Sequence, residues 1–276
     1  MTMHHDTRMR IVRLLIGGSI YLLASALHAQ KPGAEPIRDN SFLIEEAYNQ
    51  DPGVVQHINT FARPTTGSAW GYTFTQEWPV RSQRHQLSYM VPVFEMGAPT
   101  GMGVGDFAVN YRYQLTGLEA GLALAPRVSL VLPTGDATRG TGTGSASVQL
   151  MLPASFSTSH VALHANAGLA SAPRAHNAAG NVASATSFTA GGSVIWLASS
   201  TFNVLVESVW NRNASVVAQD AAVSTDHVTV APGIRWAHNL SRGVQIVPGV
   251  AYALGVGAAH DRSVFLYLSI EHPFTH

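Results

Sequence analysis

Two histidines, His160 and His164 in the stretch HVALH, are four positions apart. On a helix this spacing would place both imidazoles on one face, where they could bind a metal ion. The surrounding residues alternate between apolar and polar types, which is typical of a strand. On a strand that rises about 3.3 Å per residue, the two rings would lie about 13 Å apart, too far to share an ion. We therefore predict no metal site and no cofactor.

A glycine-rich stretch at 133–145, PTGDATRGTGTGS, is similar to a phosphate-binding loop. It lacks the Gly-Lys-Ser/Thr that would bind a nucleotide, so we expect a flexible extracellular loop instead. The chain also has no Gly-x-Ser-x-Gly motif and no cysteine, which removes two common kinds of nucleophile. We predict that the protein is not an enzyme, unless a serine and a histidine meet at the boundary of a membrane.

Seven charged side chains are predicted to lie on the polar face of strands and to line the lumen of a barrel. They are Glu77, Asp106, Arg112, Arg127, Glu207, Arg235 and Glu271. Many small residues share that face, which leaves room for water. One interpretation is that the seven bias which solutes pass, with the arginines attracting anionic or polar groups. The other is that Arg and Glu pair across the lumen and hold the barrel in shape.

The elements that must position these charges are strands, because apolar residues recur at every second position after residue 53. Near the end of the chain, for example, Val228 and Val230 alternate with Thr229. Each segment has about 10–14 residues, whereas soluble strands have about 5–6 and a tilted membrane-spanning strand needs about 9–11. The pattern predicts strands at 54–64, 69–80, 85–96, 104–116, 122–134, 146–158, 160–172, 186–198, 201–212, 226–238, 243–256 and 263–274.

The connections between these strands alternate between short turns and longer loops, as in outer-membrane proteins. The longer loops include 97–105, 136–145, 174–185 and 214–225. Lipid offers backbone groups no hydrogen-bond partner, so a sheet with an apolar outer face must close. We predict an all-β fold, a transmembrane antiparallel up-and-down β-barrel of about 12 strands. A β-sandwich or a lipocalin-like cup is the alternative, and either would place the large residues inside.

The first 29 residues have the order of a secretory signal peptide. Arg8, Arg10 and Arg13 precede an apolar run, 14–27, and small residues then lead to Ala29. We expect cleavage after Ala29, although the small residues at 24–26 offer another site. An uncleaved membrane anchor is the alternative, but the run is shorter than a span.

Residues 30–53 form a second region, and residues 54–276 form the predicted barrel. Within the former, NSFLIEEAYNQDPG at 40–53 combines apolar residues with Glu45 and Glu46. This composition predicts a short helix that Asn40 or Ser41 would cap and that Pro52 would end. The segment would either plug the periplasmic mouth of the barrel or act as a periplasmic tether.

Composition excludes several other classes of protein. The chain of 276 residues has 16 Lys+Arg and 16 Asp+Glu, and only 12% of it is charged, against about 25% in an ordinary soluble domain. Lys31 is the only lysine. Without a basic patch, binding to nucleic acid is not expected.

Three stretches carry a resemblance to a known family. They are SFLIEEAYNQDPGVVQHI at 41–58, VGDFAVNYRYQL at 104–115 and PRVSLVLPTGD at 126–136. The matching residues are Gly105, Asp106, Tyr111 and Arg112, followed by Pro126, Ser129, Leu130, Leu132, Pro133, Thr134, Gly135 and Asp136. The chain thereby resembles outer-membrane transporters of the phenol meta-degradation pathway type. The resemblance implies an outer-membrane barrel and the passage of small, often hydrophobic or aromatic, molecules.

Together these features predict a channel or facilitator for passive diffusion of small molecules across the outer membrane of a Gram-negative bacterium. Its expected partners are outer-membrane lipid, the small-molecule solute and the barrel-assembly machinery. The alternative is a plugged, non-conducting barrel with a structural or surface-binding role.

Overall fold

The computed structural model describes residues 37, 41–97, 100–257 and 261–274. All strands belong to one antiparallel sheet. They are β1 (Val54–Pro64), β2 (Trp70–Val80), β3 (Ser82–Glu95), β4 (Met102–Val104), β5 (Phe107–Tyr113), β6 (Ala123–Leu124), β7 (Arg127–Leu132), β8 (Ser147–Ser157), β9 (Val161–His176), β10 (Val182–Ser199), β11 (Phe202–Ala218), β12 (Ala221–Trp236), β13 (His238–Asn239), β14 (Gln245–Val256) and β15 (Arg262–Pro273). Three short 3₁₀ helices are η1 (Leu118–Ala120), η2 (Ala137–Arg139) and η3 (Ser241–Gly243). In the described part of the chain, none of the helices has the length and apolar character needed to cross a bilayer.

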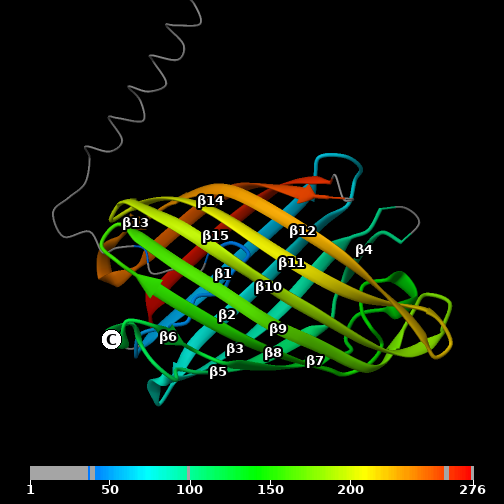
Figure 1. The fold of residues 1–276 in the computed structure, drawn as a ribbon. Coiled ribbons are helices and arrows are strands. Elements are labelled where there is room, and N and C mark those ends of the chain that lie inside the picture. The colour runs from blue at the N-terminus through cyan, green and yellow to red at the C-terminus, as the bar shows by residue number, and fades with distance from the viewer. Residues whose placement is uncertain (1–36, 38–40, 98–99, 258–260, 275–276) are drawn as a thin grey trace, which may run out of the picture.

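The sheet closes on itself into a barrel (Figure 1). The first and last strands pair along their length, with Val54 opposite Pro273. β12 pairs with β14, and this ladder is interrupted at Pro232, which has no amide hydrogen to donate. β4, β6 and β13 pair only with β3, β8 and β14. The remaining twelve strands form the wall, which confirms the predicted antiparallel barrel of about 12 strands.

The two faces of the wall have opposite chemistry. Large apolar side chains are exposed on the outside, such as Leu152 at 48% and Val194 at 54%. The positions between them point inward and are mostly small or polar, such as Ser193 at 2% and Glu207 at 0%. A water-soluble sandwich or cup would show the reverse arrangement. The prediction that the bulky residues point away from the barrel axis is confirmed.

The prediction of long loops is wrong at two places. Residues 174–185 and 214–225 are mostly strand, because β9 and β10 pair up to His176 opposite Val182, and β11 and β12 pair up to Ala218 opposite Ala221. The Ala- and Ser-rich composition of these stretches indicates loops, but their backbones complete the ladders of long hairpins. Only short turns remain, and Asp220 occupies one of them at φ 59°.

Two predicted strands, 104–116 and 122–134, are longer than the strands that form. The observed β5 and β7 have 7 and 6 residues. Pro126 and Pro133 flank β7 and cannot donate to a ladder. The carboxylate of Asp106 accepts hydrogen bonds from Gly135 N and Thr143 N, so the chain before β5 and after β7 leaves the wall to fold as loops.

The predicted helix at 40–53 is wrong for residues 41–53, which contain bends and one turn but no helix. The backbone N–H groups of this segment donate to side chains of the wall instead. Ala47 N donates to Ser155 Oγ at 2.7 Å, and Gln50 N donates to Gln86 Oε1 at 2.8 Å. Amides used in this way cannot form the intrachain bonds of a helix. Asn40, most of residues 30–40 and the predicted signal peptide at 1–29 lie outside the described residues.

Candidate functional site

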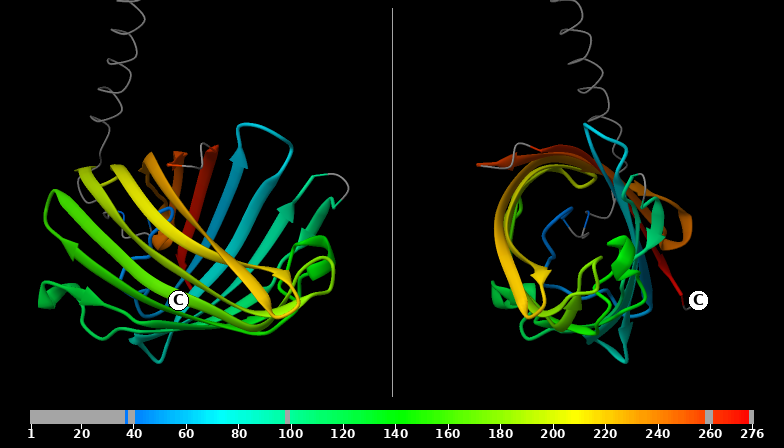
Figure 2. Two further views of the ribbon diagram at one scale, coloured as in Figure 1. Left: turned by 45° about the vertical axis from the view of Figure 1, so that its right-hand side comes forward. Right: turned by 90° about the vertical axis from the view of Figure 1, so that its right-hand side faces the viewer.

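Residues 41–50, here called the interior segment, lie inside the barrel (Figure 2). At one end, Ser41 Oγ is 2.9 Å from Ser193 Oγ on β10. At the other end, Gln50 binds Gln86 on β3 and also Gln56 on β1. β10 and β3 stand nearly opposite each other in the strand order. The interior segment therefore crosses the lumen, and of the two alternatives for this region the contacts favour a plug over a tether.

Glu207 on β11 binds three consecutive backbone amides of the interior segment. Its carboxylate oxygens accept from Phe42 N, Leu43 N and Ile44 N, each at 3.1 Å. The side chain is fully buried, and Arg235 on β12 attracts its charge. Successive amides that converge on one carboxylate form charge-assisted hydrogen bonds, which are stronger than neutral ones. Glu207 is thus the main anchor of the first half of the interior segment.

Arg112 on β5 holds the second half through its whole guanidinium group. Nε donates to Asn49 Oδ1 at 2.9 Å, Nη1 donates to the Glu46 carbonyl at 3.2 Å, and Nη2 donates to the Tyr48 carbonyl at 3.0 Å. Glu77 on β2 lies 3.6 Å from Nη2 and balances the charge. This cation therefore contacts the interior segment and Glu77.

Arg127 on β7 forms a two-pronged ion pair with Glu45 of the interior segment. Nη2 and Nε donate to the two carboxylate oxygens at 2.7 and 3.0 Å. The side chains are 13% and 31% exposed, so water screens the pair only in part. Among the charged residues predicted for the lumen, Arg112, Arg127, Glu77 and Glu207 are thus brought together around the interior segment.

A double-mutant cycle with Glu45→Ala and Arg127→Ala is expected to give a coupling free energy of about 1–2 kcal/mol, because the pair is bidentate and partly buried. The readout is the rate at which a thiol reagent modifies a Leu43→Cys reporter, which reports release of the interior segment. The exposed pair Arg212–Asp226, at 3.9 Å, is the control and should give a coupling near zero. Equal coupling in both cycles would contradict the proposed attachment.

Phe42 packs the interior segment against the wall. Its ring centroid lies 5.2 Å from that of Tyr267 and 5.7 Å from that of Phe265, both on β15. Gly233 and Gly249 form the rest of its pocket, where a Cβ atom would come within 2.6 Å of the ring. Glycine at these two wall positions lets the aromatic ring approach the backbone closely.

The other predicted lumen residues have different surroundings. Arg235 is 2% exposed and lies between Asn203 and Gly249 in the ladder register. Glu271 stands opposite Gln56 and Gln245 in the ladders on either side of it, and is half-buried. Asp106 does not face an open lumen, because its carboxylate organises the glycine-rich loop through Gly135 and Thr143.

The glycine-rich loop at 133–145 is ordered by carboxylates of this chain. Asp136 caps η2 by accepting from Thr138 N at 2.8 Å and from Thr138 Oγ1 at 2.6 Å. These hydrogen bonds, led by that from the Thr138 hydroxyl, lower the pKa of Asp136 because they favour the charged form. The loop that the sequence predicts to be flexible thus contains an internal cap.

A serine and a histidine do meet, but inside the barrel. Ser155 Oγ lies 2.7 Å from His164 Nδ1, and both side chains are buried. Ser155 also accepts from Ala47 N of the interior segment at 2.7 Å. A hydrolase would need this hydroxyl free to meet a substrate, whereas here it binds the chain itself. Among the described residues, no group of three or more potential ligands could hold a metal ion.

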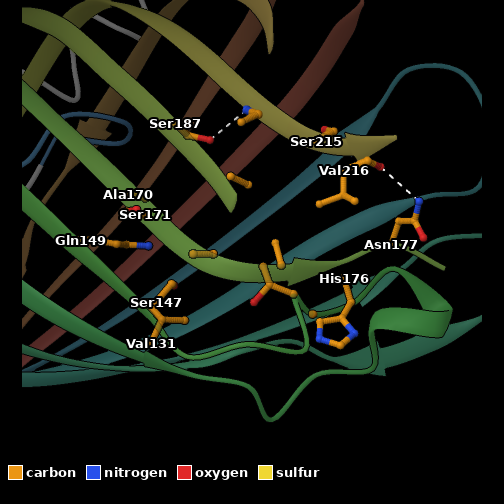
Figure 3. A pocket seen from close by; sticks show the side chains of 16 residues that line it. Val131, Ser147, Gln149, Ala170, Ser171, His176, Asn177, Ser187, Ser215 and Val216 are labelled. Carbon is orange, nitrogen blue, oxygen red and sulfur yellow. Dashed lines mark hydrogen bonds between the residues drawn. The ribbon is translucent and has the colours of Figure 1, made fainter. Parts of the chain in front are cut away.

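A second feature of the interior is a cavity of about 370 Å³ at the end of the barrel that carries the glycine-rich loop at 133–145, here called the loop-side chamber (Figure 3). It lies between the inner faces of β8, β9, β10 and β11 and below the loop at 142–147. His176 N donates to the Thr143 carbonyl at 2.8 Å and fixes this loop over the end of β9. Gln149, Ser147 and Ser215 are among its polar lining residues.

Neither a family model nor a curated protein matches the sequence, but several solved structures match the fold. An outer membrane channel from Pseudomonas putida F1 has a TM-score of 0.60 at 13% identity, covering 83% of this chain and 98% of that one. The NanC porin has a TM-score of 0.52 at 10% identity, covering 80% and 100%. The KdgM porin has a TM-score of 0.51 at 8% identity, covering 79% and 99%. At these identities the likeness shows that the barrel fold is shared.

Sequence reasoning missed most of the residues that bind the interior segment. Gln56, Gln86 and Gln114 occupy inward positions near the short turns. Long amides at such positions could have indicated a bound backbone segment, because each supplies a donor and an acceptor. Gln114, for example, accepts from Asn49 N and donates to the Ala47 carbonyl. Glu45 gives no such signal, because its partner Arg127 is 82 residues away.

Proposed function

We propose that this protein is a channel of a Gram-negative outer membrane through which small molecules diffuse passively, and that the interior segment is its gate. The observation that carries the proposal is the closed barrel with a bulky apolar exterior and a polar interior. The fold is shared with an outer membrane channel and with two porins, which supports this function. In this proposal, residues 1–29 direct export and the barrel-assembly machinery inserts the chain.

The charged residues of the lumen have a different role in this proposal from the one that the sequence suggests. Arg112 and Arg127 already bind carbonyl and carboxylate groups of the interior segment, so in the closed state they are not available to attract anions. We propose that they and Glu207 hold the gate. The second interpretation from the sequence, that Arg and Glu pair to hold the shape of the barrel, applies to Arg112 and Glu77.

The resemblance to transporters of the phenol meta-degradation pathway type extends the proposal to hydrophobic or aromatic solutes. The alternative function, a permanently plugged barrel with a structural or surface-binding role, is favoured by the many anchors of the interior segment. We propose no catalytic role, because the buried Ser155–His164 pair binds the chain's own backbone.

Recording from the refolded protein in planar lipid bilayers distinguishes these functions. A gated channel is expected to show brief openings above a closed baseline, because the interior segment is held by polar contacts that water can replace. The variant Glu207→Ala, which lacks the main anchor of the interior segment, should stay open. A barrel that is electrically silent in both forms would contradict a channel and support the plugged alternative.

The membrane location itself predicts unequal effects for two similar substitutions. Leu152 lies at the middle of β8 and is 48% exposed, whereas Val217 lies near the tip of the β11–β12 hairpin and is 51% exposed. In lipid, Leu152→Arg is expected to cost about 2–4 kcal/mol. Val217→Arg should change stability by less than about 0.5 kcal/mol, because that hairpin extends into water. Urea unfolding in phospholipid vesicles measures both, and equal costs would contradict a membrane-spanning wall.

A further inference from the structure

The loop-side chamber has a lining without formal charge. Among the described residues that line it, none is Asp, Glu, Lys or Arg, and His176 is the only titratable one. The charged residues around the interior segment lie toward the opposite, short-turn end of the barrel. The lumen is thus divided into a charged zone that the interior segment occupies and a neutral zone that remains hollow.

The carboxylate of Asp106 is hydrogen-bonded to the lining residue Thr143 and would repel an anion. Its Oδ2 accepts from Thr143 N at 2.7 Å and from Thr143 Oγ1 at 2.9 Å, while Oδ1 accepts from Gly135 N at 2.9 Å. Both oxygens are therefore used by the loop, and no lining cation offsets the charge. An anion in the chamber would lose part of its hydration without gaining a cation to balance its charge.

Several lining groups of the chamber have unused hydrogen-bonding capacity. In the described part of the chain, the side chains of Gln149, Ser147 and Ser215 have no hydrogen-bond partner. Figure 3 shows Gln149 and Ser147 from neighbouring positions on the same strand, across from Ser187 and Ser215. A primary amide supplies donors and an acceptor, and each hydroxyl supplies one donor and two acceptor lone pairs. These groups match a hydroxyl or a carbonyl better than a charged group.

The rest of the lining is apolar and small. Val131, Ala170 and Ala172 contribute methyl groups next to the polar side chains. The volume of about 370 Å³ is within the range of small-molecule sites. A compact ring could place its C–H surface on these methyl groups and its hydroxyl groups on the free amide and hydroxyls.

We propose that the loop-side chamber is a binding site for uncharged, hydroxyl-bearing small molecules and that it favours them over anions of the same size. This inference rests on the proposed channel function, for which it names the substrate class. Sugars and phenols share the required chemistry, a neutral ring with hydroxyl groups. The chamber would concentrate such a solute next to the closed gate, at the end of the barrel that carries the glycine-rich loop.

Because the chain has no cysteine, one introduced thiol can report whether the chamber is occupied. Ala170→Cys places this thiol in the lining, and Ala178→Cys in the exposed β9–β10 turn is the matched control. An uncharged thiol reagent is applied to the full-length protein in vesicles with glucose, glucuronate, phenol or 4-hydroxybenzoate. We expect glucose or phenol to slow modification of Ala170→Cys at millimolar concentration and to leave Ala178→Cys unaffected.

The comparison of each neutral solute with its anion tests the proposed selectivity against charge. The comparison of the sugar pair with the aromatic pair shows whether the chamber binds sugars or phenols. Glucuronate and 4-hydroxybenzoate, which keep the ring and the hydroxyl groups and add a carboxylate, should protect at least about tenfold less than glucose and phenol. Adding Gln149→Leu should raise the half-protecting concentration about fivefold, since one hydrogen-bonding group is lost. Protection by the anions at equal concentrations, protection that is insensitive to Gln149→Leu, or no protection by any neutral solute would each overturn the proposal.

This experiment separates the chamber from the channel. Binding to the chamber does not require the gate to open, so protection is measurable in a barrel that never conducts. Protection without conductance would retain the chamber as a site and contradict the channel. Conductance without protection would contradict the proposed binding site in the chamber but not the proposed channel.

Discussion

Replacing Glu207 with alanine is expected to change the barrel from mostly closed to mostly open. The carboxylate accepts from three consecutive amides at 3.1 Å and is 0% exposed. Alanine removes the acceptor and leaves three N–H groups of the interior segment without a protein partner. Each buried donor without a partner costs about 1–3 kcal/mol. Release of the interior segment into water would relieve that cost.

The size of the effect follows from these costs. Three such donors together cost about 3–9 kcal/mol, which corresponds to roughly two to six orders of magnitude in the ratio of open to closed states. The Arg112 and Arg127 contacts remain, so the segment would keep part of its attachment. We therefore expect long openings in planar bilayer recordings of Glu207→Ala, at a conductance that the wild-type barrel reaches only briefly.

Two variants control for the interpretation of Glu207→Ala. Glu207→Gln keeps the side-chain length and one acceptor oxygen, so its open fraction should be intermediate. A chain without residues 30–53 should show the same conductance level as Glu207→Ala, because both lack a closed gate. Circular dichroism confirms that each barrel is folded. If Glu207→Ala and the shortened chain conduct no more than the wild type, the interior segment is not a gate.

The wall could be predicted from the sequence because its signal is local. Alternation at every second position depends on which face meets lipid, so Val194 and Ser193 differ in exposure, at 54% and 2%, as the pattern requires. The ends of the strands were less predictable. Hairpins such as β9–β10 continue past the apolar band, where Ala and Ser residues indicate a loop although the ladder persists.

The gate could not be predicted because its contacts are between residues far apart in the chain. Glu207 lies 163 residues from Ile44, and a sequence pattern carries no information on such a pair. The apolar residues and glutamates at 42–46 favour a helix by propensity. The carboxylate of Glu207 and the hydroxyl of Ser155 override that propensity because they supply the acceptors that a helix would otherwise supply. Of the seven charges predicted for the lumen, Arg112, Arg127 and Glu207 bind the interior segment, and none of these partners could be read from the sequence.

A reversible covalent lock on the gate is expected to give the second large effect. Ser41 Oγ and Ser193 Oγ are 2.9 Å apart, and both side chains are buried. Cysteine differs from serine by one atom, so Ser41→Cys with Ser193→Cys places two thiols where a disulfide can form. The chain has no other cysteine, so no competing pair exists. Combined with Glu207→Ala, this bond would tether the first residue of the interior segment to β10.

Oxidation of this triple variant should return the conductance to the wild-type level, and a reductant should restore the open level within the same recording. The tether keeps the local concentration of the segment high, so the remaining contacts of Arg112 and Arg127 suffice to close the lumen. The variant Glu207→Ala with Ser193→Cys alone has one thiol and no partner for it. Its conductance should change with neither the oxidant nor the reductant. Because one barrel is compared with itself, a folding defect cannot imitate the result. Conductance that stays high after the disulfide forms would show that the solute path does not pass the interior segment.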